Sequence, residues 1–330
     1  MRPFKYSSAT DAVAASKAVS SNRDASFLAG GTNILDLMKE DVARPVELVD
    51  ISRLALTQIK AAKNGGLSIG ALAKNTDTAN HPLVRQNYPL LTQAILAGAS
   101  GQIRNMATNG GNLMQRTRCP YFYDVAMPCN KREPGTGCGA LEGINRMHAI
   151  FGWSEKCIAV HPSDMAVALA ALDAVVKVQD REGKERVIPF TEFHRLPVDL
   201  PEKDNTLNHG ELITSIEIPK NNFEARSYYL KVRDRASYAF ALVSVAAALE
   251  TQGAKIRQVR IALGGVAHKP WRASEAEKFL VGKDATDANF IEAANLEMKG
   301  AKGFEHNKFK IELGRRAIVR ALSMAMNSKA

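Results

Sequence analysis

The sequence has little that would mark a membrane-spanning or nucleic-acid-binding protein. No apolar run approaches the roughly 20 residues that cross a bilayer, and residues 1–19 lack the charged-then-apolar order of a signal peptide. Aromatic residues make up only 6% of the chain and do not interleave with the basic residues that give a net charge of +10. Because nucleic-acid binding needs clustered basic residues and a reading motif, we expect neither nucleic acid nor a membrane span. A solvated basic surface, an anionic cofactor or an acidic partner explains the charge.

Two common cofactor motifs are also missing. There is no G-x-G-x-x-G, so the classical dinucleotide fingerprint is absent. There is no C-x-x-C pair, which counts against a zinc ribbon and a ferredoxin-type run. The chain has only four cysteines, and all of them fall within 39 of its 330 residues: Cys119, Cys129, Cys138 and Cys157. Such confinement argues against four unrelated buried thiols.

The pattern of helices and strands indicates an α+β protein with three regions. Residues 1–60 alternate helix and strand, as in a small α/β unit. Residues 61–222 contain two hairpins, one turning at Gly65, and a helix capped by Ser163. Residues 223–330 alternate like antiparallel strands and then continue into three helical stretches. We expect the last region to be a separate domain with helices covering a sheet.

Two glycine-rich segments fit a diphosphate. The first, AGGTN at 29–33, lies between a strand and a helix, and the second, TNGGN, spans 108–112. Glycine lets the backbone approach a ligand, and successive N–H groups form an anion site. A single such loop is also an ordinary turn between a strand and a helix. Two of them in separate α/β regions favour a nucleotide cofactor gripped from opposite sides.

The cysteine segment is rich in proline and glycine, as in PCNKREPGTGC, and we expect a long loop with little core of its own. Such a loop needs a covalent or metal staple to be ordered. Four thiolates suit a tetrahedral zinc ion or a [4Fe–4S] cluster, and two disulfides are the alternative in an oxidising compartment. Arg118, Lys131 and Arg132 would offset the charge of a thiolate-ligated cluster.

Taken together, these segments resemble the FAD-binding medium subunit of the xanthine oxidase family of molybdenum hydroxylases. The likeness rests on AGGTN, IRNMATNGGNL, HPSDMAVALAALDA and RDRASYAFALVSVAAAL, and it extends over essentially the whole chain. The FAD subunits of bacterial periplasmic aldehyde oxidoreductases also have a similar cysteine insertion. The resemblance implies a PCMH-type (vanillyl-alcohol-oxidase-like) fold of two subdomains with a [4Fe–4S] insertion at 115–160. It also implies a C-terminal domain like that of CO dehydrogenase flavoproteins.

The resemblance also implies roles for individual residues. Thr32 stands where some flavoproteins of this wider fold tether FAD through a histidine, so we expect non-covalent FAD. Asp164 should accept a hydrogen bond from the flavin or its ribityl chain, although it also suits the first turn of a helix. Lys231 should lie near the flavin or on a strand surface, and Ile213 near the ring or in the core. All four cysteines are expected as cluster ligands. The expected FAD contacts are Ala29, Gly30, Gly31, Thr32, Asn33, Ile34, Thr108, Asn109, Gly110, Gly111, Asn112, Asp164, Ile213 and Lys231.

The function that the resemblance implies is electron transfer within a larger enzyme, with no catalytic residue in this chain. A large subunit with a molybdopterin cofactor oxidises an aldehyde to a carboxylic acid, and a small subunit with [2Fe–2S] clusters passes electrons to the FAD, which reduces an external acceptor. The alternatives are a 4-hydroxybenzoyl-CoA reductase or CO dehydrogenase type of medium subunit, a flavoprotein with structural zinc, and a scaffold protein that has lost its flavin. We expect export to the periplasm as the passenger of a signal-bearing partner, with retention in the cytoplasm as the alternative.

Overall fold

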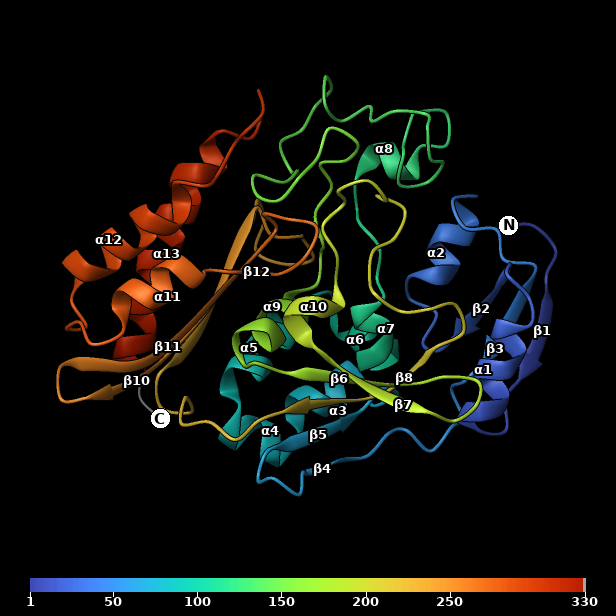
Figure 1. The fold of residues 1–330 in the computed structure, drawn as a ribbon, viewed down its shortest axis with the longest axis horizontal. Helices are drawn as coiled ribbons and strands as arrows, with labels where there is room; N and C mark the ends of the chain where they lie inside the picture. The colour runs from blue at the N-terminus through green and yellow to red at the C-terminus, as the bar shows by residue number, and fades with distance from the viewer. Residues whose placement is uncertain (329–330) are drawn as a thin grey trace.

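The computed structural model describes residues 1–328, which form three sheets and the helices that cover them (Figure 1). The first sheet is parallel, in the order β1-β3-β2. Helix α1 makes the crossover between β1 and β2, and it begins where the Asp11 carboxylate accepts a hydrogen bond from the Ala14 N–H at 2.8 Å. This unit contains β1 (Lys5–Ser8), α1 (Ala12–Ser20), β2 (Ala25–Leu28), α2 (Ile34–Lys39) and β3 (Glu47–Asp50).

The second sheet is antiparallel and has five strands in the order β4-β5-β8-β6-β7. Its strands are β4 (Ile59–Ala61), β5 (Leu67–Gly70), β6 (Val175–Gln179), β7 (Glu185–Pro189) and β8 (Leu212–Ile218). The helices of this unit are α3 (Asn75–Asn80), α4 (Pro82–Asn87), α5 (Pro89–Ala97), α6 (Gly101–Met106), α7 (Asn109–Leu113), α9 (Asp164–Ala171) and α10 (Phe190–Phe193). Every residue of α9 is buried. The expected Ser163 cap is confirmed, because its hydroxyl accepts a hydrogen bond from the Ala166 N–H.

The third sheet, β12-β11-β10-β9, is antiparallel and is covered on both faces. Along β10 the side chains alternate: Ala246 and Ala248 pack into the core that contains α9, whereas Val245 and Leu249 pack beneath the C-terminal helices. The small alanines let α9 approach the sheet closely. This unit contains β9 (Ser227–Val232), β10 (Val243–Gln252), β11 (Lys255–Gly264), β12 (Trp271–Arg272), α11 (Ser274–Leu280), α12 (Asp287–Met298) and α13 (Phe309–Asn327).

The cysteine insertion crosses the top of Figure 1 as green loops and has one short helix, α8 (Pro120–Tyr123). At one end Phe122 packs against Leu37 of α2. Toward the other end, Ile150 and Phe151 are buried in the core of the C-terminal unit, and both donate their N–H to the Val266 carbonyl. The insertion is thus docked at both ends on the cores of other units, and the expectation that its ordering needs a staple stays a prediction.

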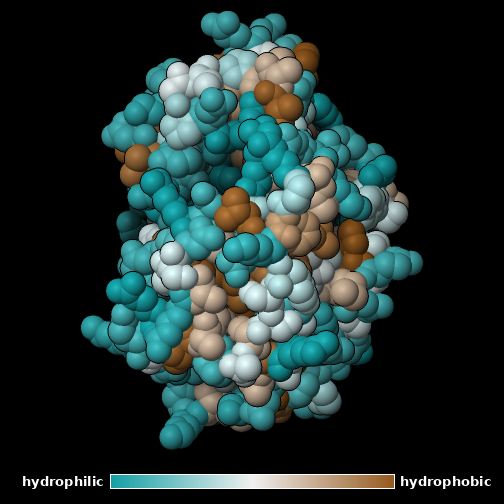
Figure 2. Space-filling model, turned by 90° about the vertical axis from the view of Figure 1, so that its right-hand side faces the viewer, coloured by the Kyte–Doolittle hydropathy of each residue, from teal (hydrophilic) through white to brown (hydrophobic). Residues whose placement is uncertain are grey.

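The side shown in Figure 2 is mostly hydrophilic, with apolar residues scattered over it. Within residues 1–328, no helix is both long and apolar enough to span a bilayer.

Lys310, in the first turn of α13, is fully buried and has no acidic partner in the described part of the chain. Its ammonium group donates hydrogen bonds to the carbonyls of His148 and Gly265. Burial lowers the pKa of Lys310 to about 7, and the nearby Arg146 adds to the effect. Helix α13 thus holds the insertion through a cation that is costly to keep charged.

We expect this cost to appear as a pH dependence of stability. The unfolded lysine titrates near 10.5 and the folded one near 7, so between these values the unfolded chain binds more protons. The stability of the wild type relative to Lys310→Met should therefore rise with pH in that window, by up to about 1.4 kcal/mol per pH unit. Denaturant unfolding of both proteins from pH 6 to 10 measures this difference, and a flat difference would contradict the assignment.

Candidate functional site

A cavity of about 900 Å³ opens between the three units. Thr32 and Asn33 line it from the first glycine turn, Asp164 from the start of α9, and Lys231 and Phe240 from the C-terminal unit. Its size is at the upper end of the range for small-molecule sites. The cavity therefore has room for a large ligand in contact with both glycine segments.

The first glycine turn has free donors beside this cavity. Gly30 lies against the end of α6, where an added Cβ would be 2.0 Å from the Met106 carbonyl oxygen, so only glycine fits. Within the described residues, the N–H groups of positions 30–33 donate no hydrogen bond to another protein group. The Asn33 side-chain amide nitrogen is also buried without a partner there. Such a set of unpaired donors suits an anion.

The second glycine segment differs from the expected open turn, because it folds into helix α7 with Thr108 as its cap. The N–H groups of Asn109 and Gly110 bond to the carbonyls of Ala73 and Ala71. Those of Gly111 and Asn112 both bond to Thr108, so no backbone donor at 109–112 is free for a phosphate. Gly111 and the Asn112 side chain line the cavity, and the rest of the segment supports them.

Asp164 and Lys231 form a buried ion pair at the cavity wall. Lys231 Nζ lies 2.7 Å from Asp164 Oδ2, with the two side chains 5% and 7% exposed. The Tyr229 hydroxyl donates to Asp164 Oδ1 at 2.7 Å. Burial raises the pKa of Tyr229 well above its usual value, and the carboxylate raises it further, so the hydroxyl keeps its proton. Lys231 is therefore a buried counter-ion, not a surface lysine.

The other expected flavin residues lie in two kinds of place. The cavity is lined by Thr32, Asn33, Gly111, Asn112, Asp164 and Lys231. The remaining ones are not among its lining residues: Ala29, Gly30, Gly31, Ile34, Thr108, Asn109, Gly110 and Ile213. Ile213 pairs with Val178 in the sheet and belongs to the core. Whether any of these residues contacts FAD stays a prediction.

Sequence reasoning missed much of the cavity wall. Gly98, Ala99 and Arg104 line it from the connection around α6, and Arg235 and Tyr238 line it from the segment after β9. The signal for the first group is the run of small residues at 97–101. At Gly98 an added Cβ would approach Asp164 to 3.2 Å. The second group left no local signal, because tertiary packing alone brings it to the cavity.

The four cysteines line one small cavity inside the insertion, and all four are free thiols. Burial, together with the nearby Cys129 and Cys157, raises the pKa of Cys119 to about 12. The pKa of Cys157 is likewise raised to about 12, although Lys131 acts in the opposite direction. Within residues 1–328, no group of three or more His, Cys, Asp or Glu side chains is placed to hold a metal ion. The thiols therefore share a cavity without forming the compact set that a single ion needs.

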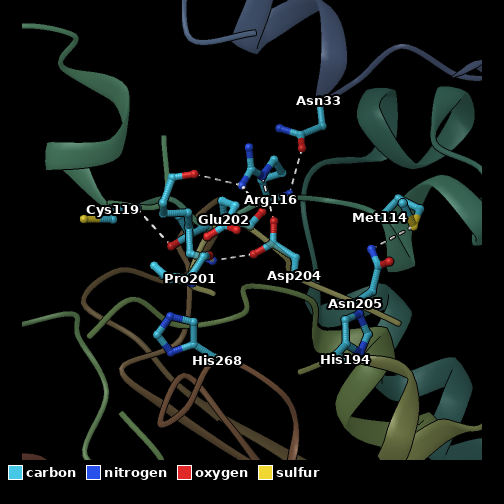
Figure 3. Close-up of polar contacts among 12 residues, drawn as sticks. Asn33, Met114, Arg116, Cys119, His194, Pro201, Glu202, Asp204, Asn205 and His268 are labelled. Atoms are coloured by element: carbon cyan, nitrogen blue, oxygen red, sulfur yellow. Dashed lines mark hydrogen bonds and ion pairs between the residues drawn. The ribbon is translucent and has the colours of Figure 1, made fainter. Parts of the chain in front are cut away.

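A partly buried charge network supports the cysteine cavity (Figure 3). Asp204 accepts hydrogen bonds from Arg116 at 2.7 Å and from Lys131, whose side chain is only 2% exposed. Burial alone would raise the pKa of Asp204, but Arg116 and Lys131 outweigh it and hold the pKa well below its usual range. The backbone N–H of Arg116 donates a hydrogen bond to Asn33 Oδ1 at 2.9 Å, which connects the network to the first glycine turn.

Comparison with known protein families agrees with this geometry. The family model for the FAD-binding domain in molybdopterin dehydrogenase matches residues 2–221, and the model for the CO dehydrogenase flavoprotein C-terminal domain matches residues 228–323. The chain therefore belongs to the family of FAD-binding subunits of molybdopterin dehydrogenases, that is, it is a flavoprotein subunit of an oxidoreductase. Membership confirms the expected family and fold class.

Comparison with individual proteins shows which members of this family the chain is similar to. The chain is 48% identical to the aldehyde oxidoreductase FAD-binding subunit PaoB of Escherichia coli strain K12, over 98% of this chain and 99% of that one. It is 30% identical to the glyceraldehyde dehydrogenase medium chain of Sulfolobus acidocaldarius, over 86% and 83% of the two chains. The solved carbon monoxide dehydrogenase of Hydrogenophaga pseudoflava shares the fold with a TM-score of 0.77 at 24% identity, covering 100% of this chain and 99% of that one.

The close approach at Gly30 predicts a specific defect. Gly30→Ala forces the first turn away from the Met106 carbonyl at a cost of about 1–3 kcal/mol, which should weaken FAD binding by about tenfold or more. Gly101→Ala is the matched control, because an added Cβ there meets nothing within 4 Å. Flavin content and fluorescence titration measure both variants. Equal flavin affinity in the two would contradict the role of the contact.

The Asp204 network predicts a second defect. Asp204→Asn leaves Lys131 buried beside a neutral group, which should cost about 3–5 kcal/mol of stability. Because the pKa of Asp204 is lowered by folding, this difference should be full above about pH 4 and shrink as the pH falls further. Asp199→Asn, in an exposed pair with Lys156, is the control with little expected effect. Unfolding curves of the variants at pH 3 and pH 7 test this, and equal losses would refute it.

Proposed function

We propose that this chain is the FAD- and [4Fe–4S]-containing electron-transfer subunit of a molybdenum-dependent aldehyde oxidoreductase. The single observation that carries the proposal is the likeness to an aldehyde oxidoreductase FAD-binding subunit over nearly the full length of both chains. A second relative with 30% identity also belongs to an aldehyde-oxidising enzyme by name. Both favour an aldehyde over carbon monoxide or an aromatic acyl-CoA as the substrate of the complex.

The residues of the large cavity fit FAD. The unpaired N–H groups at 30–33 and the orphaned Asn33 amide supply donors for the diphosphate. The Asp164 carboxylate would accept from a ribityl hydroxyl or a flavin N–H, and Lys231 balances its charge. Thr32 has no imidazole with which to form a covalent link, so FAD is held non-covalently. When bound, FAD supplies a centre that takes up electrons singly and releases them in pairs.

The cysteine cavity supports the cluster proposal through its ligands, because all four thiols line one space. A [4Fe–4S] cluster is held by four cysteines at its corners. Lys131 lies close enough to Cys157 to lower its pKa, so it would offset thiolate charge. Loading with metal would release the thiol protons.

The remaining subunits complete the proposed enzyme. A large molybdopterin subunit oxidises the aldehyde to a carboxylic acid, and a small subunit with [2Fe–2S] clusters delivers the electrons to the FAD for an external acceptor. Cysteines must be reduced to hold iron, so we propose cytoplasmic assembly, followed by export of the folded complex to the periplasm on a partner's signal. Fractionation of cells into periplasm and cytoplasm tests the location.

Purification of the native complex tests the proposed function. We expect two partner chains, molybdenum, FAD, and iron in excess of what the small subunit holds. A preparation with fully occupied subunits but neither flavin nor molybdenum would refute the proposal. Flavin and molybdenum with one zinc per chain, in place of the excess iron, would instead support the structural-zinc alternative.

Each cysteine can be tested separately. Serine at any one of Cys119, Cys129, Cys138 or Cys157 should remove the cluster and lower the stability of the insertion, because one ligand is lost. Met127→Leu, a change at an exposed residue of the same insertion, should keep the iron content. Iron and acid-labile sulfide analysis gives the answer. Retention of about four irons in a Cys→Ser variant would rule out that cysteine as a ligand.

A further inference from the structure

Two of the four cysteines have a histidine nitrogen at hydrogen-bonding distance. His148 Nε2 lies 3.1 Å from Cys119 Sγ, and His268 Nε2 lies 3.2 Å from Cys157 Sγ. Both imidazoles are buried, with 3% and 7% of the residues exposed. His148 belongs to the insertion, whereas His268 follows β11 in the C-terminal unit, and Figure 3 shows His268 below the Arg116–Asp204 network.

The chemistry of a metal-bound cysteine decides which atom donates. A ligating sulfur is a thiolate and has no proton, so it can only accept. An imidazole carries an N–H on at least one of its two ring nitrogens, and on both when it is protonated. Nδ1 of each ring has no partner in the described part of the chain. Placing the proton on Nε2 therefore lets each ring donate a hydrogen bond to its sulfur.

Hydrogen bonds hold the backbone at both of these histidines. The His148 carbonyl accepts hydrogen bonds from Lys310 at 2.7 Å and from the Asn307 side chain at 3.2 Å. The residue before His268, Ala267, accepts from the His161 N–H at 2.9 Å. The backbone at each histidine is thus held by contacts that do not involve the cysteines.

We propose that His148 and His268 donate N–H···S hydrogen bonds to the Cys119 and Cys157 ligands of the cluster and thereby raise its reduction potential. The inference rests on the cluster of the proposed function. Reduction adds negative charge that the sulfurs share, so a donor to sulfur stabilises the reduced state more than the oxidised one. Both histidines are positioning residues, because they act through the sulfurs and not on a substrate.

The experiment compares variants of the native complex by redox titration with detection by electron paramagnetic resonance. Phenylalanine at position 148 or 268 keeps a ring but removes the donor. We expect each variant to lower the ratio of reduced to oxidised cluster at fixed potential by about tenfold, which is about 59 mV for one electron. Glutamine keeps an N–H donor at similar reach and should restore most of the shift. His194→Phe is the control, because this buried histidine contacts the Leu113 carbonyl and no sulfur.

Iron and sulfide analysis of the same samples distinguishes a failure of the proposed cluster from a failure of the role proposed for the histidines. A wild-type complex without the extra iron and sulfide overturns the proposed cluster and this inference with it. A wild-type complex with the cluster, and Phe variants with unchanged potentials, overturns only the role of the histidines. If the Phe variants lose the cluster, the Gln variants decide: wild-type cluster content and potential support the donor role, and loss of the cluster there overturns it.

Discussion

The ion pair between Asp164 and Lys231 is the contact on which the arrangement of the site depends. It joins the first turn of α9 to strand β9 at a depth where neither side chain is more than 7% exposed. Burying two charges is costly unless each is well paired, and here the Tyr229 hydroxyl completes the set. The pair therefore fixes the C-terminal sheet against α9, and the alanines of β10 allow the close packing. The large cavity lies directly beside this ion pair, and both side chains form part of its wall.

Polar contacts of the insertion connect the wall of the large cavity to the cysteine cavity. Asn33 has its amide nitrogen unpaired beside the cavity and its oxygen bonded to the Arg116 N–H. Arg116 and Lys131 share Asp204, and Lys131 lies near Cys157. A continuous path of polar contacts thus runs from the first glycine turn to the residues that line the cysteine cavity. In the proposed function, this common support would hold FAD and the cluster at a fixed separation, which is what electron transfer between centres requires.

Local patterns were enough to predict the hairpins, the capped helix α9, the first glycine turn and the grouping of the cysteines. The second glycine segment escaped prediction because Ala71 and Ala73 of a distant strand end supply its backbone partners. The Asp164–Lys231 pair spans 67 positions, and Cys157 and His268 are 111 positions apart. Such contacts follow from how the units pack, and no spacing rule encodes them. The burial of Ile150 and Phe151 was missed for the same reason, since their partners belong to the C-terminal core.

Anomalous X-ray scattering from crystals of the native complex, recorded on both sides of the iron edge and of the zinc edge, tests most directly whether the insertion holds iron. We expect a strong iron peak enclosed by Cys119, Cys129, Cys138 and Cys157, together with isoalloxazine density in the large cavity. An empty cysteine cavity, or a peak there that appears only at the zinc edge, would contradict this account.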